Sequence, residues 1–405
     1  MNCLFLLADN YPYSGACTSL LENLFFKGNL EKSIDCIEVL ACKKELCSLK
    51  SVCVDGITVH DFVFLPYVSF RKCKAALAKH PIMAIRGIAK KLLLKLNSRE
   101  IKSDNVNSVK RALKNINAWK FDVIVAVMGS FDVAAAAMIY KKKNPDIKLV
   151  VYQVDPCSTN EVSPSSTKKE REDFERELYS VSDGIITTPV LFEESKALYT
   201  KEIIDKMIPM EFPNVVPVKD DNSKNNADIR CLFAGNIYGN FRDPKYTLRL
   251  FDKVDSSIKF EVIGSVKPEV KSEFEQHSVL YHGPKPLEET KSELKKADVL
   301  VNIGNGMLNQ VPSKLFEYIS YGKPIINICK NRNCPTIPYL EKYKYALNLY
   351  EEDDIFEEQV KLINDFILKN YKSRMTAEEI LKEFETCTPQ YCANQMLDVL
   401  KSICK

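Results

Sequence analysis

A short run from residue 311 to residue 328 carries side chains suited to binding an anionic ligand that also bears hydroxyl groups. Pro312 and Ser313 suit the start of a helix, because proline fits the first turn and a serine hydroxyl can accept from a free N–H group. Lys314 adds a positive charge to that turn, where the helix N-terminus already favours phosphate. Glu317 follows about one turn later, and its carboxylate can accept hydrogen bonds from hydroxyl groups.

The elements that must position these side chains follow directly in the sequence. Leu315, Phe316 and Ile319 recur at helical spacing and predict a buried helix face. Gly322 ends this helix and Pro324 prevents it from resuming. Ile325, Ile326 and Ile328 then predict a buried strand. A loop, a short helix, a tight turn and a strand are therefore expected here.

Strands alternate with helices through the rest of the chain, which predicts doubly wound parallel sheets. The ligands of such sheets bind at the carboxyl ends of strands, where Gly129, Ser130 and Asp155 are expected. Asp155 is a candidate for contacting a hydroxyl group of a ligand that accepts a transferred group, or for acting as a base. The polar, proline-bearing interval 216–228 predicts a linker, after which a second α/β unit begins.

The run at 311–328 resembles the donor-nucleotide segment of the GT-B glycosyltransferases, especially the family 4 type. In that family, a Pro-Ser-Lys-like helix start and a Glu-Tyr-x-x-x-Gly-Lys-Pro turn hold a nucleotide sugar, and both occur within residues 312–324. The resemblance implies two Rossmann-like domains facing a cleft, an acceptor domain at 1–215 and a donor domain at 229–385. It also implies that a helix at 386–405 crosses back to the N-terminal domain.

The same resemblance implies roles for residues outside that run. Gly15 matches a glycine in the family's first loop, and Arg242 and Lys245 are the nearest matches to a basic pair that clamps the donor diphosphate. His282 matches a segment near the nucleotide base, with an ordinary structural histidine as the alternative. Asn309 stands where many members carry the first of two glutamates, the second matching Glu317. This departure leaves the identity of the sugar, and partly the retaining stereochemistry, open.

The resemblance implies transfer of a hexose or related sugar from a nucleotide diphosphate donor, with a UDP-sugar favoured, to a saccharide acceptor. That acceptor is a growing bacterial surface glycan, free or lipid-linked. Asp155 and Glu317 are the expected catalytic residues. No cofactor is expected, and no Asp-x-Asp motif calls for a metal ion. Two alternatives are a nucleotide-sugar epimerase of the same fold and a non-catalytic subunit that partners an active transferase.

The bulk composition bounds where such a protein would work. The 405 residues are 45% hydrophobic and 27% charged, which predicts packed globular domains. A net charge of +3 argues against generic nucleic-acid binding. No signal peptide or spanning segment is apparent, and fourteen scattered cysteines read as reduced thiols, so a cytoplasmic protein is expected.

Residues 71–99 contain nine Lys or Arg and no acidic residue. Their apolar residues share one helical face, while Arg86, Lys90, Lys91 and Lys95 lie off it. Such a segment suits an anionic membrane surface, here the inner face of the membrane. An ordinary surface helix that packs on its domain is the alternative.

Overall fold

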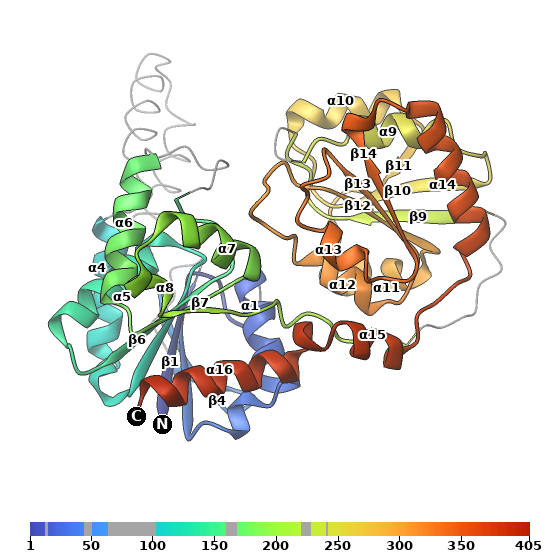
Figure 1. Ribbon diagram of the computed structural model, residues 1–405. Helices are drawn as coiled ribbons and strands as arrows, with labels where there is room; N and C mark the ends of the chain where they lie inside the picture. The colour runs from blue at the N-terminus through green and yellow to red at the C-terminus, as the bar shows by residue number, and fades with distance from the viewer. Residues whose placement is uncertain (13–14, 44–50, 64–102, 159–167, 220–227, 240–241) are drawn as a thin grey trace, which may run out of the picture. The chain divides into compact units, whose positions relative to one another are not determined.

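The chain folds into two compact α/β units (Figure 1). The computed structural model describes residues 1–12, 15–43, 51–63, 103–158, 168–219, 228–239 and 242–405. Unit 1 comprises Met1–Pro213 together with Pro389–Lys405, and unit 2 comprises Asn214–Thr388. The basic segment 71–99 lies outside the described residues.

Unit 1 is built on a sheet of eight strands in the order β3-β4-β2-β1-β5-β6-β7-β8. Every neighbouring pair is parallel except β3 and β4, which form an antiparallel edge. The strands are β1 (Asn2–Leu7), β2 (Cys36–Cys42), β3 (Ser51–Val54), β4 (Ile57–Phe62), β5 (Val123–Val127), β6 (Lys148–Gln153), β7 (Gly184–Thr187) and β8 (Met207–Pro209). Strand order reverses between β1 and β5, which makes the carboxyl ends of these two strands a topological switch point.

Three helices, α4, α5 and α6, pack on one face of this sheet through a shared apolar core (Figure 1). The α-helices of unit 1 are α1 (Ala16–Glu22), α4 (Ser103–Asn115), α5 (Phe131–Lys143), α6 (Lys168–Val181), α7 (Pro189–Leu198), α8 (Lys201–Ile204) and α16 (Pro389–Ile403). Shorter turns are η1 (Asn23–Lys27), a π-helix that extends α1, together with η2 (Leu30–Lys32) and η3 (Ala118–Lys120). Parallel strands connected by helices, as the sequence predicts, account for the buried runs of β1, β5 and β6.

The last helix, α16, packs on the first unit, as expected from the resemblance. A side chain at Gly28 would place its Cβ 2.5 Å from the Cβ of Ala393, so the absence of one lets η1 lie against α16. A Cβ at Gly184 would lie 2.4 Å from Ile403 Cδ1. Gln395 Nε2 also donates to the carbonyl oxygen of Pro209 at 2.8 Å.

Unit 2 is built on six parallel strands in the order β11-β10-β9-β12-β13-β14. They are β9 (Ile229–Ala234), β10 (Ile258–Ile263), β11 (Val279–Tyr281), β12 (Val299–Ile303), β13 (Ile325–Cys329) and β14 (Ala346–Tyr350). The order reverses between β9 and β12, so this unit also has a switch point at the carboxyl edge of its sheet.

Helices cover both faces of the second sheet (Figure 1). The α-helices are α9 (Lys245–Phe251), α10 (Pro268–Gln276), α11 (Leu287–Lys296), α12 (Lys314–Ser320), α13 (Ile337–Leu340), α14 (Phe356–Asn370) and α15 (Ala377–Glu383), with 3-10 turns η4 (Glu351–Asp353) and η5 (Glu385–Cys387). The core that α9, α10 and α14 share with the sheet includes Phe233, Val262 and Ile326. The predicted fold class, two Rossmann-like α/β domains, is confirmed.

The beginning of the predicted linker is fixed to unit 2. The Val216 N–H donates to the hydroxyl of Ser320 at 2.9 Å, and the Val218 N–H donates to the Ser320 carbonyl at 2.8 Å. The Val215 N–H donates to the Cys387 carbonyl at 3.0 Å. Since the Val216 and Val218 N–H groups bind Ser320 at the end of α12, the chain enters unit 2 in contact with the helix that carries Lys314 and Glu317.

Candidate functional site

The loops that follow β9 and β12 meet at the switch point of unit 2. β9 leads into Gly235 and Asn236, and β12 leads into Gly304 and Asn305. Gly264 closes the floor of this edge, because its φ is +140° and a Cβ there would lie 2.0 Å from the Gly235 carbonyl oxygen. The backbones that follow β9 and β10 are therefore very close here, at the edge of the sheet where parallel α/β folds bind ligands.

Arg242 is the buried cation of this edge, with 8% of its surface exposed. Its Nη1 donates to the Asn236 carbonyl oxygen at 2.9 Å and its Nη2 donates to Asn305 Oδ1. The guanidinium carbon lies 5.7 Å from the ring centre of Phe233. Burial lowers the pKa of Arg242, but arginine stays protonated at any physiological pH. Two strand-end loops thus hold a permanent positive charge in place.

Lys314 opens α12 close to this arginine. Burial lowers the pKa of the Lys314 ammonium; Glu317 opposes that shift, and the charge of Arg242 adds to it. Within the part of the chain that the structure describes, no hydrogen bond or ion pair is formed by the ammonium group. A partly buried cation without a hydrogen-bond or ion-pair partner is costly, because burial disfavours the charged form. An anion bound beside Lys314 and Arg242 would offset that cost.

The helix α12 is anchored from below by apolar and aromatic side chains. Leu315, Phe316 and Ile319 are fully buried, as predicted from their spacing. The Tyr318 hydroxyl accepts from the Ala234 N–H at 2.8 Å, which ties α12 to the end of β9. Glu317 is partly exposed on the helix turn next to Lys314. The helix therefore offers one cation and one carboxylate from a fixed position.

The predicted serine cap of α12 is wrong. Ser313 has φ −57° and ψ −25°, already helical, and its side chain accepts no N–H of the first turn. A capping serine needs an extended backbone to reach back to those N–H groups. Pro312 is buried and Asn309 lies in the turn before it. These residues shape the approach to Lys314 without forming the expected cap.

Two other residues predicted for this site have partners elsewhere in unit 2. Lys245 begins α9, is half-exposed, and lies 3.6 Å from Glu273 of α10. His282 follows β11, and its Nε2 lies 2.8 Å from Glu261 Oε2. Glu261 also binds Arg230, so His282 belongs to an ion network on the sheet. Arg242 and Lys314 are the predicted cations that the structure brings together.

The remaining predicted residues, Gly15 and Asp155, lie in unit 1. Gly15 has φ +131°, and a Cβ there would lie 2.0 Å from Asp9 Oδ2. The glycine lets Asp9 accept the N–H groups of Cys17 and Thr18 at 2.9 and 3.3 Å, which caps α1. Asp155 is exposed after β6. Burial, together with the charges of Asp9 and Asp155, raises the pKa of Cys17 to about 12. Both carboxylates thus lie near the start of α1, by the switch point.

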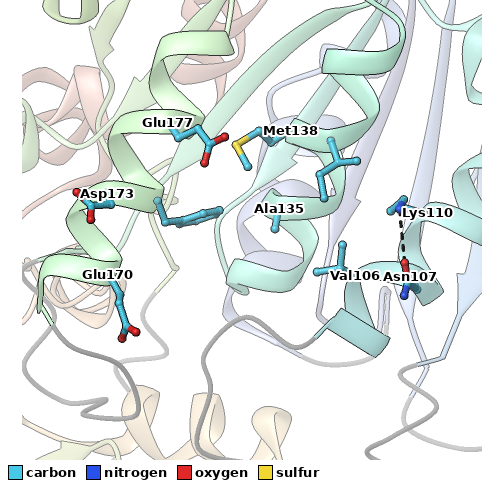
Figure 2. Close-up of a pocket in the computed structure, with 10 residues that line it drawn as sticks. Val106, Asn107, Lys110, Ala135, Met138, Glu170, Asp173 and Glu177 are labelled. Carbon is cyan, nitrogen blue, oxygen red and sulfur yellow. Dashed lines mark hydrogen bonds between the residues drawn. The ribbon is translucent and has the colours of Figure 1, made fainter.

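A pocket lies in unit 1, between α4, α5 and α6 (Figure 2). It has a volume of about 600 Å³. Its lining combines the apolar side chains of Ala135 and Met138 with three carboxylates along α6, those of Glu170, Asp173 and Glu177. None of the predicted site residues lines it. Among the residues that the structure describes, no group of three His, Cys, Asp or Glu side chains is placed to bind a metal ion.

Sequence reasoning missed Asn236 and Asn305, the two residues that hold Arg242. Both were recognisable, since each directly follows a glycine at the end of a predicted strand. It also missed the role of Lys323, whose Nζ donates to the carbonyl oxygens of Leu294, at 3.1 Å, and Ala297, at 2.5 Å. Lys323 therefore binds carbonyl oxygens at the end of α11 and in the residue that follows it.

The fold is that of the GT-B glycosyltransferases. The lipopolysaccharide outer core galactosyltransferase WaaB, in its apo form, is 12% identical, with a TM-score of 0.59 and 99% of each chain covered. Anabaena HepE, in complex with UDP and glucose, is 12% identical, with a TM-score of 0.62 over 99% of this chain and all of that one. A putative UDP-N-acetylglucosamine 2-epimerase from Listeria monocytogenes is 11% identical, with a TM-score of 0.56 over 99% and 96%.

The TM-scores establish the shared fold. The low identities mean that the activity has to be inferred from the site. No protein-family model matches the sequence, and no curated protein matches it either. No helix within the described ranges combines the length and apolar character that crossing a bilayer demands.

Proposed function

We propose that the chain is a glycosyltransferase whose second unit binds the diphosphate of a nucleotide sugar beside Arg242 and Lys314. One observation carries the proposal: two cations meet at the switch point of the sheet, and the Lys314 ammonium forms no hydrogen bond or ion pair within the described residues. Structural neighbours that bind UDP and glucose, or transfer galactose, support the same ligand class. A UDP-sugar is the favoured donor.

Transfer of the sugar leaves negative charge on the departing diphosphate. Preorganised positive groups at that position stabilise the transition state more than the ground state, because charge develops there during bond breaking. Arg242 is held by two strand-end loops and Lys314 by an anchored helix, so neither must reorganise. These two cations replace a metal ion in the proposed mechanism. Glu317 accepts from donor hydroxyls, and Asn309 contacts the transferred sugar, consistent with a retaining reaction.

The acceptor belongs to unit 1 in this proposal. It is a saccharide of a surface glycan, free or carried on a lipid, and Asp155 contacts its hydroxyl or receives its proton. Asp155 is suited to this by its exposed position after β6. Gly15 lies in the first loop of the same unit. A lipid-linked acceptor would bring the protein to the inner face of a membrane.

A thermal-shift and calorimetric screen over UDP-sugars, with UDP alone included, tests donor binding. A ligand present at one hundred times its dissociation constant stabilises the folded chain by about 2.7 kcal/mol. Lys314→Ala removes a charged contact worth roughly 1.5–3 kcal/mol, so affinity falls about ten- to a hundredfold. Lys245→Ala is the matched control, because its exposed side chain already pairs with Glu273. Equal affinity in the parent protein and Lys314→Ala contradicts the proposal.

Two alternatives remain distinct in their products. An epimerase, for which the Listeria monocytogenes neighbour is the supporting observation, changes a nucleotide sugar with no acceptor present. A non-catalytic subunit, favoured by asparagine at position 309, binds donor but releases no UDP in the presence of acceptor. Measuring UDP release with and without saccharide acceptors, and the sugar recovered, separates all three.

A further inference from the structure

Two cysteine side chains meet at the end of β13, in the sheet that carries the candidate donor site. Cys329 is the last residue of that strand and Cys334 follows a short loop. The sulfur atoms lie 3.6 and 3.1 Å from the same atom, Thr336 Oγ1. Both side chains are buried, whereas Lys330 and Arg332 in the loop between them are exposed. Among the described residues, no cysteine forms a disulfide.

The two thiols also interact directly. Interaction with Cys334, together with burial, raises the pKa of Cys329, whereas interaction with Cys329 lowers the pKa of Cys334. Thr336 adds to the lowering at Cys334. A thiolate is the reactive form of cysteine, so the pair has one preferred nucleophile and one adjacent protonated thiol. This arrangement is that of an attacking and a resolving cysteine.

We infer that Cys329 and Cys334 form a dithiol modification site that reacts with small-molecule disulfides. The Cys334 thiolate attacks one sulfur of the disulfide, the disulfide bond breaks, and one small thiolate leaves. Cys329 then loses its proton and attacks the Cys334 sulfur of this mixed disulfide, which releases the second small thiol. Two protein thiols are oxidised to one disulfide, and the small disulfide is reduced to two thiols.

Access to the pair depends on the polar loop that separates the two residues. Because both sulfurs are buried, the attack requires a local opening of residues 330–333, which costs free energy and slows the reaction. The exposed Cys53 of β3 offers the comparison, since its thiol needs no opening. Cys53 therefore reacts faster but stops at the mixed disulfide unless a neighbouring thiol resolves it.

The pair contacts the loop that carries the partner of Arg242. The Gly304 N–H donates to the Ile328 carbonyl at 2.9 Å, and a Cβ at Gly304 would lie 3.3 Å from Cys329 Sγ. Gly304 is followed by Asn305, which accepts from Arg242. A disulfide draws the two sulfur atoms to bonding distance, about 2.0 Å, and this displaces Cys329 beneath the loop. Weaker donor binding after oxidation follows, a consequence that rests on the proposed function.

Incubation of the full chain with oxidised glutathione tests the site, with the products read by intact mass and peptide mapping. The parent protein gives a Cys329–Cys334 disulfide. Cys329→Ser stops at a glutathione adduct on Cys334, and Cys334→Ser gives no adduct on Cys329. Cys53→Ser, the control, forms the same disulfide as the parent. Free thiols at both positions after Cys53 is fully modified, or no adduct on Cys334 in Cys329→Ser, overturn the inference.

A second test uses the unmodified chain, so that its result does not depend on whether a cysteine variant folds. Phenylarsine oxide condenses with two adjacent thiols and releases water, so mapping of the unmodified chain locates an arsenic bridge between Cys329 and Cys334. Its absence there counts against the inference as well. UDP affinity is then compared between reduced and oxidised chains, with about a tenfold loss expected on oxidation, a coupling of roughly 1.4 kcal/mol. No UDP binding by the reduced chain contradicts the proposed function alone, while an unchanged affinity contradicts only the coupling.

Discussion

Lys314 and Lys323 belong to the same run of sequence, residues 311–328, yet their surroundings differ completely. Lys323 is 1% exposed, and its ammonium donates to carbonyl oxygens of Leu294, Lys295 and Ala297 at the end of α11. A cation at that helix end satisfies carbonyl groups that have no partner within the helix. Lys314 is partly buried without such acceptors. One lysine stabilises the fold, and the other is available to a ligand.

The two lysines should therefore respond in opposite ways to replacement by methionine. Lys323→Met leaves buried carbonyls without a donor and lowers the free energy of unfolding by roughly 2–4 kcal/mol, with little change in donor affinity once folded. Lys314→Met removes a partly buried, unpartnered charge, so stability is kept or rises while donor affinity falls. Urea denaturation and calorimetric titration of UDP measure both quantities. The same response from both variants would refute this division of roles.

Sequence reasoning located the candidate site but could not assign every side chain in it. Lys314, Glu317 and Arg242 were identified, and the first and last of these are brought together. Lys245 was indistinguishable from Arg242 by type and spacing, because its pairing with Glu273 depends on how α9 and α10 pack. The sequence places Asn305 at a strand end, but the arginine that it holds is fixed only by the fold.

At the scale of elements, a ladder of amides crosses three strands of unit 2. Asn302, Asn327 and Asn348 are paired in register on β12, β13 and β14. Asn302 Nδ2 donates to Asn327 Oδ1 at 2.7 Å, and Asn327 Nδ2 donates to Asn348 Oδ1 at 2.8 Å. A shift by one residue would bury these amides against apolar neighbours, so the ladder favours one strand register.

Asn327→Leu tests the ladder, since it leaves the amide of Asn302 and the hydroxyl of Thr336 without their central partner. We expect a loss of about 2–4 kcal/mol in the free energy of unfolding, measured by urea denaturation. The double variant Asn302→Leu with Asn327→Leu should lose less stability than the sum of the two single variants, because neither amide is then left buried without the other as its partner. Strictly additive losses would show that the amides act independently.

A second network joins strand β9 to its neighbours. Arg230 binds Glu261 at 2.6 and 2.8 Å and Glu293 at 2.8 Å. Burial alone would raise the pKa of Glu293, but hydrogen bonds from Lys296 and Arg230 lower it from 4.5 to about 2. The folded chain thus keeps this carboxylate ionised at a pH where the unfolded chain protonates it. The stabilisation is complete above about pH 4.5 and is lost as the pH falls towards 2.

Arg230→Met should therefore destabilise the chain most at neutral pH. Removing one partner of a buried ion pair costs about 3–5 kcal/mol, and we expect a smaller loss here because Glu293 keeps Lys296 and Glu261 keeps His282 as a partner. As the pH falls below 4.5, those carboxylates become neutral in the variant, and the parent loses the stabilisation that its ion pairs contribute. Denaturation curves at pH 7 and pH 3 should show the gap between the two proteins shrinking. A gap that widens in acid contradicts the assigned ion network.

At the scale of the whole molecule, the order and type of elements were predictable to a large extent. Buried strands such as β1 and β12 appear in the sequence as short, mainly apolar runs, and α16 was expected close to its observed bounds. Short elements were missed, including the edge strand β3 and the π-helix η1. Their formation depends on pairing with β4 and on contact with α16, neither of which is local in the sequence.

Membrane attachment through residues 71–99 remains a prediction about a segment outside the described residues. Each Lys or Arg near an anionic surface contributes about 1 kcal/mol, and salt screens the attraction. The full chain should sediment with vesicles containing anionic lipid at low salt and release at high salt. Replacing Arg86, Lys90, Lys91 and Lys95 by glutamine should reduce sedimentation with UDP affinity unchanged. If the parent chain stays in solution at low salt, the support for a lipid-linked acceptor is lost.

The packing of α16 on η1 and β7 has a consequence for how the chain is made. Unit 2 is a single continuous stretch, so all of its strands leave the ribosome before the residues of α16 are joined. While the whole of unit 2 is synthesised, the apolar groups of unit 1 that α16 covers are therefore still exposed to water. Domains usually fold as they emerge. Here the second unit is free to fold first, and the first unit is completed last, when α16 packs on it.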